Sequence, residues 1–405
     1  MEVDFLYNYN PWWESGYKFD DLKERTIVKR LIIEIENKSI IMITGLRRVG
    51  KSTAMKLIIK HLIEVVGIES KYILYVSLDN YIFDKFNLFE ILEKYRQIHK
   101  LRTEEKVYLF FDEILYKDAW QQQLKNIYDM YNYKIFASSS MSSKLRDEKA
   151  FLTGREKIFE MQPLDFEEYL QFKGIEVKKR DYALIDAYFE DYLRVGGIPE
   201  YVITGDVSYL NALIDDIIYK DIIAYNKLKD SKLVRDFFLL LMERAGKQLS
   251  LSKIKNILGD SVSIDTISRY INYFADTYLI YQVPYYGKTN EIIRNPKKLY
   301  AADIGIRNTY TGFRDKGAIF ENYVFLKIRN MEPSYVLKDG IELDFITRNK
   351  KVIECKYGPN AEMSENQKKL FNEIDAEKKY EINGIRDLLK FEEENVDSGN
   401  GLRYY

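Results

Sequence analysis

The sequence predicts an α/β fold in which a parallel sheet core is followed by a helical lid, a short helix-turn-helix segment and a second α/β domain. Two observations lead to this expectation. Short apolar runs alternate with amphipathic helical patterns as far as Ala137, which is typical of parallel strands joined by crossover helices. From Pro163 to Lys247 the apolar residues recur mostly with helical spacing, and strand-like runs return only after residue 277.

The composition is that of a folded chain with balanced charge. Of 405 residues, 46% are hydrophobic, and 62 Lys and Arg stand against 63 Asp and Glu. This balance excludes a uniformly basic nucleic-acid-binding coat but leaves room for a local basic groove. A single cysteine, Cys355, excludes an internal disulfide and is expected to pack in a core. No apolar run reaches the roughly 18 residues of a membrane span, and the N-terminus lacks the features of a signal peptide, so we expect a cytoplasmic protein with no membrane partner.

Four strands of the first sheet are expected, each at a short apolar run. They lie at 39–44, 72–78, 106–111 and 133–137, and an amphipathic helix is expected at 51–66. The pattern changes along the chain then predict four domains, namely a parallel-sheet core at 1–162, a helical lid at 163–247, a helix-turn-helix segment at 248–287 and a second α/β domain at 288–405.

The third of these segments has the order helix, turn, helix and apolar strand, which is that of a winged helix-turn-helix. The exposed positions of its second helix carry one basic residue, Arg269, whereas helices that read a DNA groove usually carry more. A packing or coupling role is therefore favoured over duplex binding, and both stay open. The basic stretch at 288–316 either contacts phosphates or is a solvated face.

The strongest motif is Gly45-Leu46-Arg47-Arg48-Val49-Gly50-Lys51-Ser52, which fits G-x-x-x-x-G-K-[ST] at every fixed position. An expected strand precedes it and an expected helix follows, so that free N–H groups at the helix N-terminus face the phosphates. Lys51 would reach the β- and γ-phosphates, and Ser52 would ligate Mg²⁺. The motif predicts an ATP site made by Gly45, Arg47, Arg48, Val49, Gly50, Lys51, Ser52 and Thr53.

Two further strands end in polar residues that complete this site. Asp112 and Glu113 follow the apolar run at 107–111, where Asp112 could hold Mg²⁺ and Glu113 could polarise an attacking water. The next strand ends in three serines, of which Ser139 is the expected contact to the γ-phosphate, although an ordinary serine-rich loop is an equal alternative. Arg155 is either an arginine finger or a structural ion-pair partner. Trp12 and Trp13 either stack on adenine or, as we favour, pack against the core.

In these motifs the chain resembles the AAA+-superfamily ATPases of archaea and bacteria that join an N-terminal ATPase to a restriction-endonuclease-like C-terminal domain. The matching pieces, within about residues 40–202, are GLRRVGKST, LFFDEI, LTGR, PLDFEEYL and GGIPEYV. The resemblance implies that Arg155 is a finger or a phosphate sensor of its own chain. It also implies that the turn ending in Pro199 lies near the nucleotide base, with a helix-terminating loop as the alternative.

The C-terminal domain carries a second set of candidate residues. Asp344 lies in one expected strand, and Glu354 and Lys356 lie on one face of the next, so a hairpin would bring the three together. Such a set can cleave a phosphodiester, because the two carboxylates can hold Mg²⁺ and the lysine can orient water or stabilise the developing charge. The pattern resembles the PD-(D/E)xK nuclease superfamily, which implies that the earlier Glu321 also serves the metal. A solvated acidic hairpin is the alternative.

Together these features predict a Mg²⁺-dependent ATPase, with ATP and Mg²⁺ as cofactors and DNA and further copies of the chain as possible partners. It would process DNA through a nuclease-like domain in which Asp344, Glu354 and Lys356 are catalytic. The alternative is a nucleotide-dependent switch or scaffold that binds DNA or a protein without cleaving it.

Overall fold

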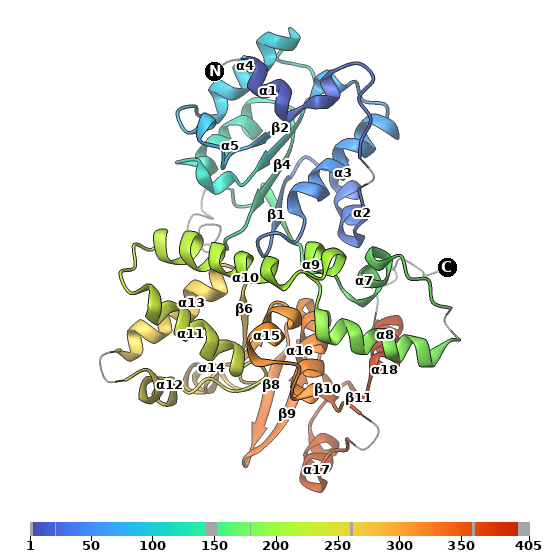
Figure 1. Cartoon of the computed structure of the whole chain (residues 1–405), viewed down its shortest axis with the longest axis vertical. Coiled ribbons are helices and arrows are strands. Elements are labelled where there is room, and N and C mark those ends of the chain that lie inside the picture. Colours follow the sequence, from blue (N-terminus) through green and yellow to red (C-terminus); the bar gives the residue numbers. More distant parts are fainter. Residues whose placement is uncertain are drawn as a thin grey trace. The chain divides into compact units, whose positions relative to one another are not determined.

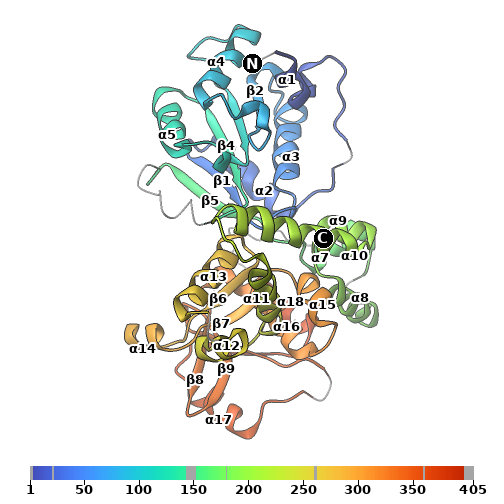
Figure 2. The same cartoon turned by 60° about the vertical axis from the view of Figure 1, so that its left-hand side comes forward.

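The computed structural model describes residues 3–20, 22–142, 152–178, 180–259, 262–358 and 361–395. They form two compact units, Met1–Gln162 with Asp276–Tyr278 and Pro163–Ala275 with Leu279–Tyr405. Figures 1 and 2 show each unit with its own sheet and helices. Within the described ranges, no helix is both long and apolar enough to cross a membrane.

The first unit is built on a five-stranded parallel sheet in the order β2-β3-β4-β1-β5. The four expected strands are confirmed, and a fifth, β5, adds an edge that the sequence pattern did not indicate. The strands are β1 (Ile40–Thr44), β2 (Ile73–Ser77), β3 (Tyr108–Asp112), β4 (Lys134–Ser139) and β5 (Glu156–Glu160). Because all run in parallel, their carboxyl ends share one edge of the sheet, where the candidate nucleotide residues follow β1, β3 and β4.

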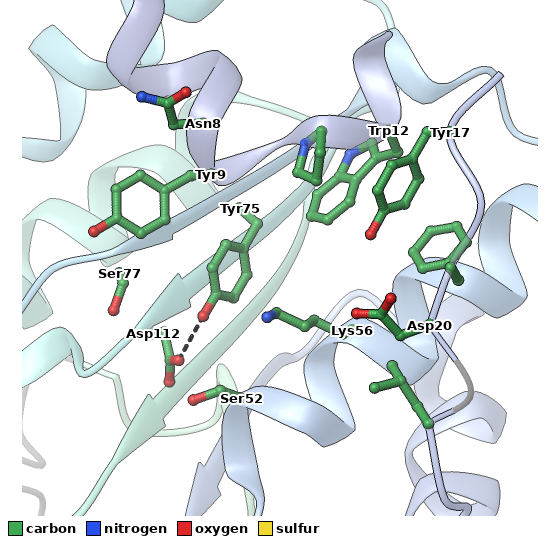
Figure 3. Close-up of a pocket in the computed structure, with 13 residues that line it drawn as sticks. Asn8, Tyr9, Trp12, Tyr17, Asp20, Ser52, Lys56, Tyr75, Ser77 and Asp112 are labelled. Carbon is green, nitrogen blue, oxygen red and sulfur yellow. Dashed lines mark hydrogen bonds between the residues drawn. The ribbon is translucent and has the colours of Figure 1, made fainter. Parts of the chain in front are cut away.

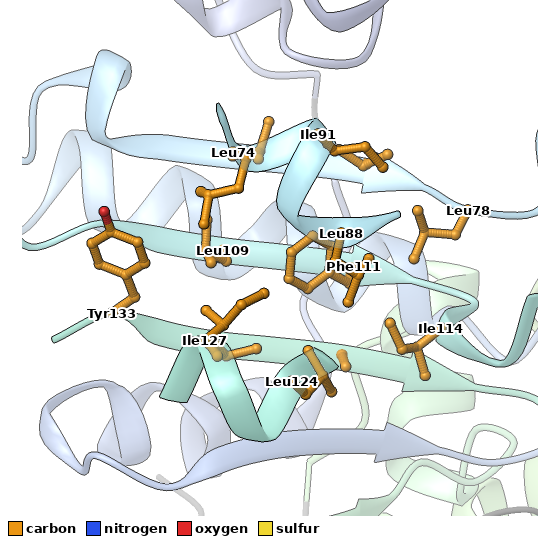
Figure 4. Packing of buried hydrophobic residues seen from close by; sticks show 14 of the residues in the cluster. Leu74, Leu78, Leu88, Ile91, Leu109, Phe111, Ile114, Leu124, Ile127 and Tyr133 are labelled. Atoms are coloured by element: carbon orange, nitrogen blue, oxygen red, sulfur yellow. The ribbon is translucent and has the colours of Figure 1, made fainter. Parts of the chain in front are cut away.

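Helices cover both faces of this sheet. α4 (Leu88–His99) and α5 (Trp120–Met130) pack on one face against alternate strand residues such as Leu109 and Phe111 (Figure 4). α3 (Lys51–Glu64), the expected helix, and α2 (Thr26–Ile33) lie side by side and supply a second set of buried residues. Burial of apolar surface on both faces is what holds a parallel sheet together.

The N-terminal segment covers the free edge of β2. It contains α1 (Val3–Tyr9) and a short 3₁₀ turn, η1 (Pro11–Trp13). The Asn10 side chain takes the role of a neighbouring strand, since it accepts from Tyr75 N at 2.7 Å and donates to Tyr75 O at 2.9 Å. The Trp13 indole donates to Ile73 O at 2.9 Å. The segment therefore satisfies polar groups that an edge strand would leave open, and the packing interpretation of Trp13 is confirmed.

The second unit begins with helices, as expected after Pro163. They are α7 (Phe166–Lys173), α8 (Tyr182–Val195), α9 (Pro199–Thr204), α10 (Val207–Asp216), the π-helical η7 (Ile217–Ala224) and α11 (Ser231–Glu243). A helix pair and a two-stranded antiparallel sheet follow, formed by α12 (Leu251–Leu258), α13 (Ile264–Asp276), β6 (Ile280–Val283) and β7 (Lys298–Ala301), with α14 (Thr289–Arg294) between the strands. The partner of β6 thus lies beyond residue 287, where the expected segment ended.

A mixed four-stranded sheet, in the order β11-β10-β9-β8, completes the second unit. The expected hairpin is confirmed, because β9 and β10 pair antiparallel with Val352 opposite Ile346. The elements are α15 (Ile304–Thr311), α16 (Lys316–Ile328), β8 (Ser334–Lys338), β9 (Ile341–Ile346), β10 (Lys351–Cys355), α17 (Glu365–Glu373), β11 (Lys378–Ile382) and α18 (Ile385–Asn395). Cys355 lies in a core cluster that this sheet shares with α7 and α8, so its expected packing role is confirmed. The proposed subdivision of this unit into three domains stays a prediction.

Candidate functional site

The loop between β1 and α3 has the backbone that its glycines predict. Gly45 has φ 135° and Gly50 has φ 103°, values that other residues rarely adopt. A Cβ atom at Gly45 would lie 2.1 Å from Met161 O, so a residue with a side chain would not fit at this position. α3 begins at Lys51, and its first N–H groups follow directly on the loop.

Two basic side chains hold this loop from within the unit. Lys51 Nζ is buried and donates to Gly45 O at 2.9 Å and Leu46 O at 3.0 Å. Arg25, which immediately precedes α2, donates to Val49 O at 2.7 Å and to Gln162 O at 2.8 Å. Sequence reasoning missed Arg25, because a lone arginine in a polar stretch carries no motif.

Asp112 lies at the carboxyl end of β3 and is buried. Its Oδ2 accepts from the Tyr75 hydroxyl at 2.7 Å, and its Oδ1 accepts from the Ser138 hydroxyl. Burial, followed by the charge of Asp112, raises the pKa of Tyr75, so this hydroxyl stays a proton donor. Tyr75 was also missed, although the alternation of β2 places it on the same side as Ser77, at the edge where the phosphate loop was expected.

Ser52 and Asp112 line one pocket of about 340 Å³ together with Tyr75, Lys56 and Trp12 (Figure 3). A serine hydroxyl and a carboxylate are the protein ligands with which Mg²⁺ is commonly held beside substrate phosphates. The residues present therefore fit Mg²⁺, which Ser52 and Asp112 would hold.

Glu113 follows Asp112 with φ 52°, and two serines fix it. Its N–H donates to Ser138 Oγ at 2.8 Å, and its carboxylate accepts from the Ser140 hydroxyl at 2.5 Å and the Ser140 N–H at 3.3 Å. The expected sensor, Ser139, instead donates to Met141 O at 2.8 Å. The assignment of Ser139 stays a prediction that this contact does not favour, because alternation along β4 places Ser138 and Ser140 on one face of the sheet and Ser139 on the other.

Arg155 lies far from the phosphate loop of its own chain. Its carbonyl accepts from Ile40 N at 2.8 Å, which places it at the amino edge of the sheet, whereas the loop follows the carboxyl edge. Its guanidinium pairs with Asp129 at 3.1 Å. The structure therefore does not support a phosphate sensor in the same chain, and a role as a finger for another copy stays a prediction.

The turn before Pro199 lies in the second unit and ends α8, as the helix-terminating alternative predicted. Gly197 N donates to Asp303 Oδ2 at 2.7 Å, and Gly197 O accepts from Leu164 N at 2.7 Å. A Cβ atom at Gly197 would lie 2.0 Å from Leu164 O, so packing alone explains this glycine. Contact between Pro199 and a nucleotide base stays a prediction.

The C-terminal residues are brought together by the β9–β10 hairpin. Asp344 N donates to Glu354 Oε2 at 3.0 Å, and Cys355 N donates to Asp344 Oδ2 at 2.9 Å. Lys356 Nζ lies 2.9 Å from Glu354 Oε1. Burial, followed by the charge of Asp344, raises the pKa of Glu354 to about 8. The predicted triad thus shares one site, and Glu354 is its most buried member.

The same cluster contains a lysine that the sequence did not associate with it. Lys298 Nζ lies 2.7 Å from Glu321 Oε1, 2.6 Å from Glu342 Oε1 and 3.4 Å from Asp344 Oδ1. Burial by itself would lower the pKa of Lys298, but the neighbouring carboxylates raise it well above its usual value. Lys298 is only 1% exposed, so the solvated-face interpretation of the basic stretch is wrong at this residue.

This arrangement does not fit the metal expected at Glu321, Asp344 and Glu354. In the described part of the chain, no three His, Cys, Asp or Glu side chains converge so as to hold an ion. Burial, followed by the charge of Asp344, raises the pKa of Glu321 to about 7, and Glu321 Oε1 also accepts from the Tyr300 hydroxyl at 2.6 Å. This geometry does not support the expected metal set, which stays a prediction, and it places Lys298 in an ion cluster with two of the three carboxylates.

Comparison with known families matches two parts of the chain. Residues 37–170, which hold the phosphate loop, Asp112 and Glu113, match the family model described as an AAA domain. Residues 186–317 match one described as a domain of unknown function (DUF8612), which assigns neither nuclease nor DNA-binding chemistry.

Two similar proteins carry the description uncharacterized protein. One from Methanocaldococcus jannaschii is 29% identical over 375 residues, covering 86% of this chain and 81% of that protein. Another, from Haemophilus influenzae, is 26% identical over 341 residues, covering 81% and 84%.

Two solved structures show weaker likeness. The ORC1 protein of Aeropyrum pernix in complex with DNA is 12% identical and covers 77% of this chain and 95% of that chain, with a TM-score of 0.34. AMPPCP-bound DnaA of Aquifex aeolicus is 15% identical and covers 66% and 92%, with a TM-score of 0.31. Scores this low support no conclusion, so the comparisons establish similarity to an AAA domain over residues 37–170.

Proposed function

We propose that the chain is a Mg²⁺-dependent ATPase that binds ATP at Gly45–Thr53 and hydrolyses its γ-phosphate. The observation that carries this proposal is the meeting of Ser52 and Asp112 in one pocket, where the phosphate loop enters α3. The similarity of residues 37–170 to an AAA domain supports it independently of the geometry.

Each side chain has a role in this proposal that follows from its position. Lys51 exchanges the carbonyls of Gly45 and Leu46 for the β- and γ-phosphates when ATP binds. Ser52 and Asp112 would hold Mg²⁺, which would supply positive charge against the charge that develops on the phosphates. Glu113, one residue after Asp112, leaves Ser140 and accepts hydrogen bonds from the attacking water.

The test is Mg²⁺-dependent ATP turnover by the full chain. We expect Lys51→Ala to abolish turnover and ATP binding, and Glu113→Gln to abolish turnover while ATP still binds. Lys60→Ala, which alters a lysine later in α3, is the matched control and should keep full turnover. Equal turnover in the wild type and in Lys51→Ala would contradict the proposal.

The proposed cycle would act on a partner through the second unit, and two forms of this coupling are compatible with the expectations from sequence. In one, the chain processes DNA through Asp344, Glu354 and Lys356. In the other, it is a nucleotide-dependent switch or scaffold that binds DNA or a protein without cleavage. The position of Lys298 among the carboxylates favours the second form, because an ammonium group lies where a nuclease would need its metal.

A DNA panel distinguishes the two forms. Duplex, single-stranded, forked and four-way DNA would be incubated with ATP and Mg²⁺, and the strands then run on a denaturing gel. We expect intact strands for the wild type and for Asp344→Ala alike. Cleavage that disappears in Asp344→Ala and Lys356→Ala would establish DNA processing instead.

A further inference from the structure

We propose that Lys298 is a tethered cation that takes the place of a divalent metal in the cluster of Glu321, Glu342 and Asp344, so that this cluster binds neither Mg²⁺ nor Mn²⁺. The proposal is independent of ATP hydrolysis, because the cluster and the phosphate loop belong to different units of the chain.

Three carboxylates surround the ammonium group of Lys298. Its three carboxylate partners come from α16 and β9, and the oxygens of Glu321 and Glu342 lie 2.7 and 2.6 Å from Nζ. Carboxylate oxygens are the ligands that a divalent cation prefers, but with Lys298 among them no three such side chains of the described residues are arranged to hold an ion. At 1% exposure Lys298 is almost wholly buried.

Backbone pairing holds Lys298 in place on both sides. On one side it pairs with Val283 of β6, and on the other it forms an isolated bridge with Gln248. The Gln248 side chain donates to Glu342 Oε2 at 2.7 Å. Both carboxylate oxygens of Glu342 are therefore engaged, one by Lys298 and the other by Gln248. Strand pairing therefore fixes the backbone of Lys298, and the carboxylates of Glu321 and Glu342 hold its ammonium group.

Both carboxylate oxygens of Asp344 and both of Glu354 are engaged as well. Asp344 uses Oδ1 for Lys298 and Oδ2 for Cys355 N. Glu354 uses Oε1 for Lys356 and Gln367 and uses Oε2 for Asp344 N. A metal could bind only by displacing these hydrogen bonds together with a buried ammonium group, which would then lack its counter-charges.

The test is a Mn²⁺ titration of the full chain without nucleotide, with free Mn²⁺ measured by electron paramagnetic resonance. Asp112→Asn is present in every sample so that the phosphate-loop pocket does not contribute. We expect no site in this background. Lys298→Met, which keeps the length of the side chain and removes its charge, should gain one Mn²⁺ site, and added Mn²⁺ should raise its thermal midpoint by several degrees.

Two controls assign the gained site. Lys297→Met alters the adjacent exposed lysine and should gain nothing. Adding Asp344→Asn to Lys298→Met should remove the gained site. If Lys298→Met does not fold, the double variant Lys298→Met with Glu342→Gln is titrated in its place. The double variant also removes one of the negative charges that Lys298 balances.

Either of two results would overturn the proposal. One is a Mn²⁺ site that is present with Lys298 intact and lost in Asp344→Asn. The other is a folded Lys298→Met protein, or its double variant, that takes up no Mn²⁺. ATP turnover of the chain with Asp112 intact is measured separately, so failure of this proposal and failure of the ATPase proposal would be told apart.

Discussion

At the scale of single residues, serine hydroxyl groups determine how the two acidic side chains of the phosphate site are held. Ser138 engages Asp112, whereas Ser140 engages Glu113. Ser139 lies between them in sequence, and among the contacts described its hydroxyl bonds only with the backbone of Met141. Neighbouring serines of identical chemistry therefore have different roles, and strand alternation decides which is which.

We predict that Ser140→Ala raises basal ATP turnover several-fold, because Glu113 would lose the stronger of its two bonds to residue 140 and be freer to meet the attacking water. The measurement is kcat and KM for ATP, with the change expected in kcat. Ser139→Ala is the matched control and should leave both constants unchanged. A drop in kcat for Ser140→Ala would show instead that Ser140 positions Glu113 for catalysis.

At the scale of elements, the turn between α8 and α9 is held by groups that lie far away in sequence. Asp303 is the N-cap of α15, accepting from Ile306 N at 2.8 Å, and its other oxygen accepts from Gly197 N at 2.7 Å. The same turn pairs with Leu164, just before α7. One buried carboxylate therefore joins α15 to the turn between α8 and α9.

We predict that Gly197→Ala lowers the free energy of unfolding by about 3 kcal/mol or more, because the new methyl group would overlap the carbonyl of Leu164. Gly205→Ala is the comparison, since that position has φ 70° but open space around it. It should cost only about 1 kcal/mol. Denaturant unfolding followed by circular dichroism measures both, and equal losses would contradict the packing argument.

A pH dependence follows from Asp303. Burial raises the pKa of Asp303 from 3.8 to about 6. The folded chain therefore keeps this proton at pH values where the unfolded chain has released it, and the resulting stability is complete below about pH 4 and is lost as the pH rises through 6. The loss amounts to about 3 kcal/mol at roughly 1.4 kcal/mol per pKa unit.

We predict that this decline between about pH 4 and pH 6 is about 3 kcal/mol smaller in Asp303→Asn, where the raised pKa values of Glu321 and Glu354 still contribute, and is unchanged in Asp206→Asn, which alters the exposed N-cap of α10. The measurement is the free energy of unfolding at each pH. An unchanged decline in Asp303→Asn would assign the effect to other carboxylates.

At the scale of the whole molecule, the two units have different kinds of interior. The first has a parallel sheet with a polar carboxyl edge, where the candidate ATP residues lie. The second joins a helical layer to a mixed sheet through one apolar cluster and places an ion cluster beside it. This organisation is compatible with the proposed function, in which the first unit binds ATP and the second unit binds a partner.

We predict that Arg155 acts between copies of the chain, because it lies at the edge of the sheet opposite its own phosphate loop. Turnover per chain should then rise with protein concentration, and Arg155→Ala should remove this rise. Mixing Arg155→Ala with Glu113→Gln chains should restore part of the activity, since each variant supplies what the other lacks. Turnover that does not depend on concentration, with Arg155→Ala fully active, would contradict this prediction.

The sequence alone was sufficient for the features that depend on contiguous residues. The phosphate loop between a strand and a helix, the four central strands of the first sheet and the β9–β10 hairpin all follow from periodicity and spacing, because those patterns record which face of an element is buried. They also placed Asp112 and Glu113 at the correct strand end.

Tertiary structure decided the features that depend on residues far apart in the chain. Tyr75 reaches Asp112 across 37 positions, Arg25 reaches Gln162 across 137, and Lys298 reaches Asp344 across 46. No local pattern records such contacts, because they arise from strand order and from the packing of whole elements. The sequence therefore determined a phosphate-binding loop and an acidic hairpin, and only the folded chain showed that a lysine lies among the carboxylates of that hairpin.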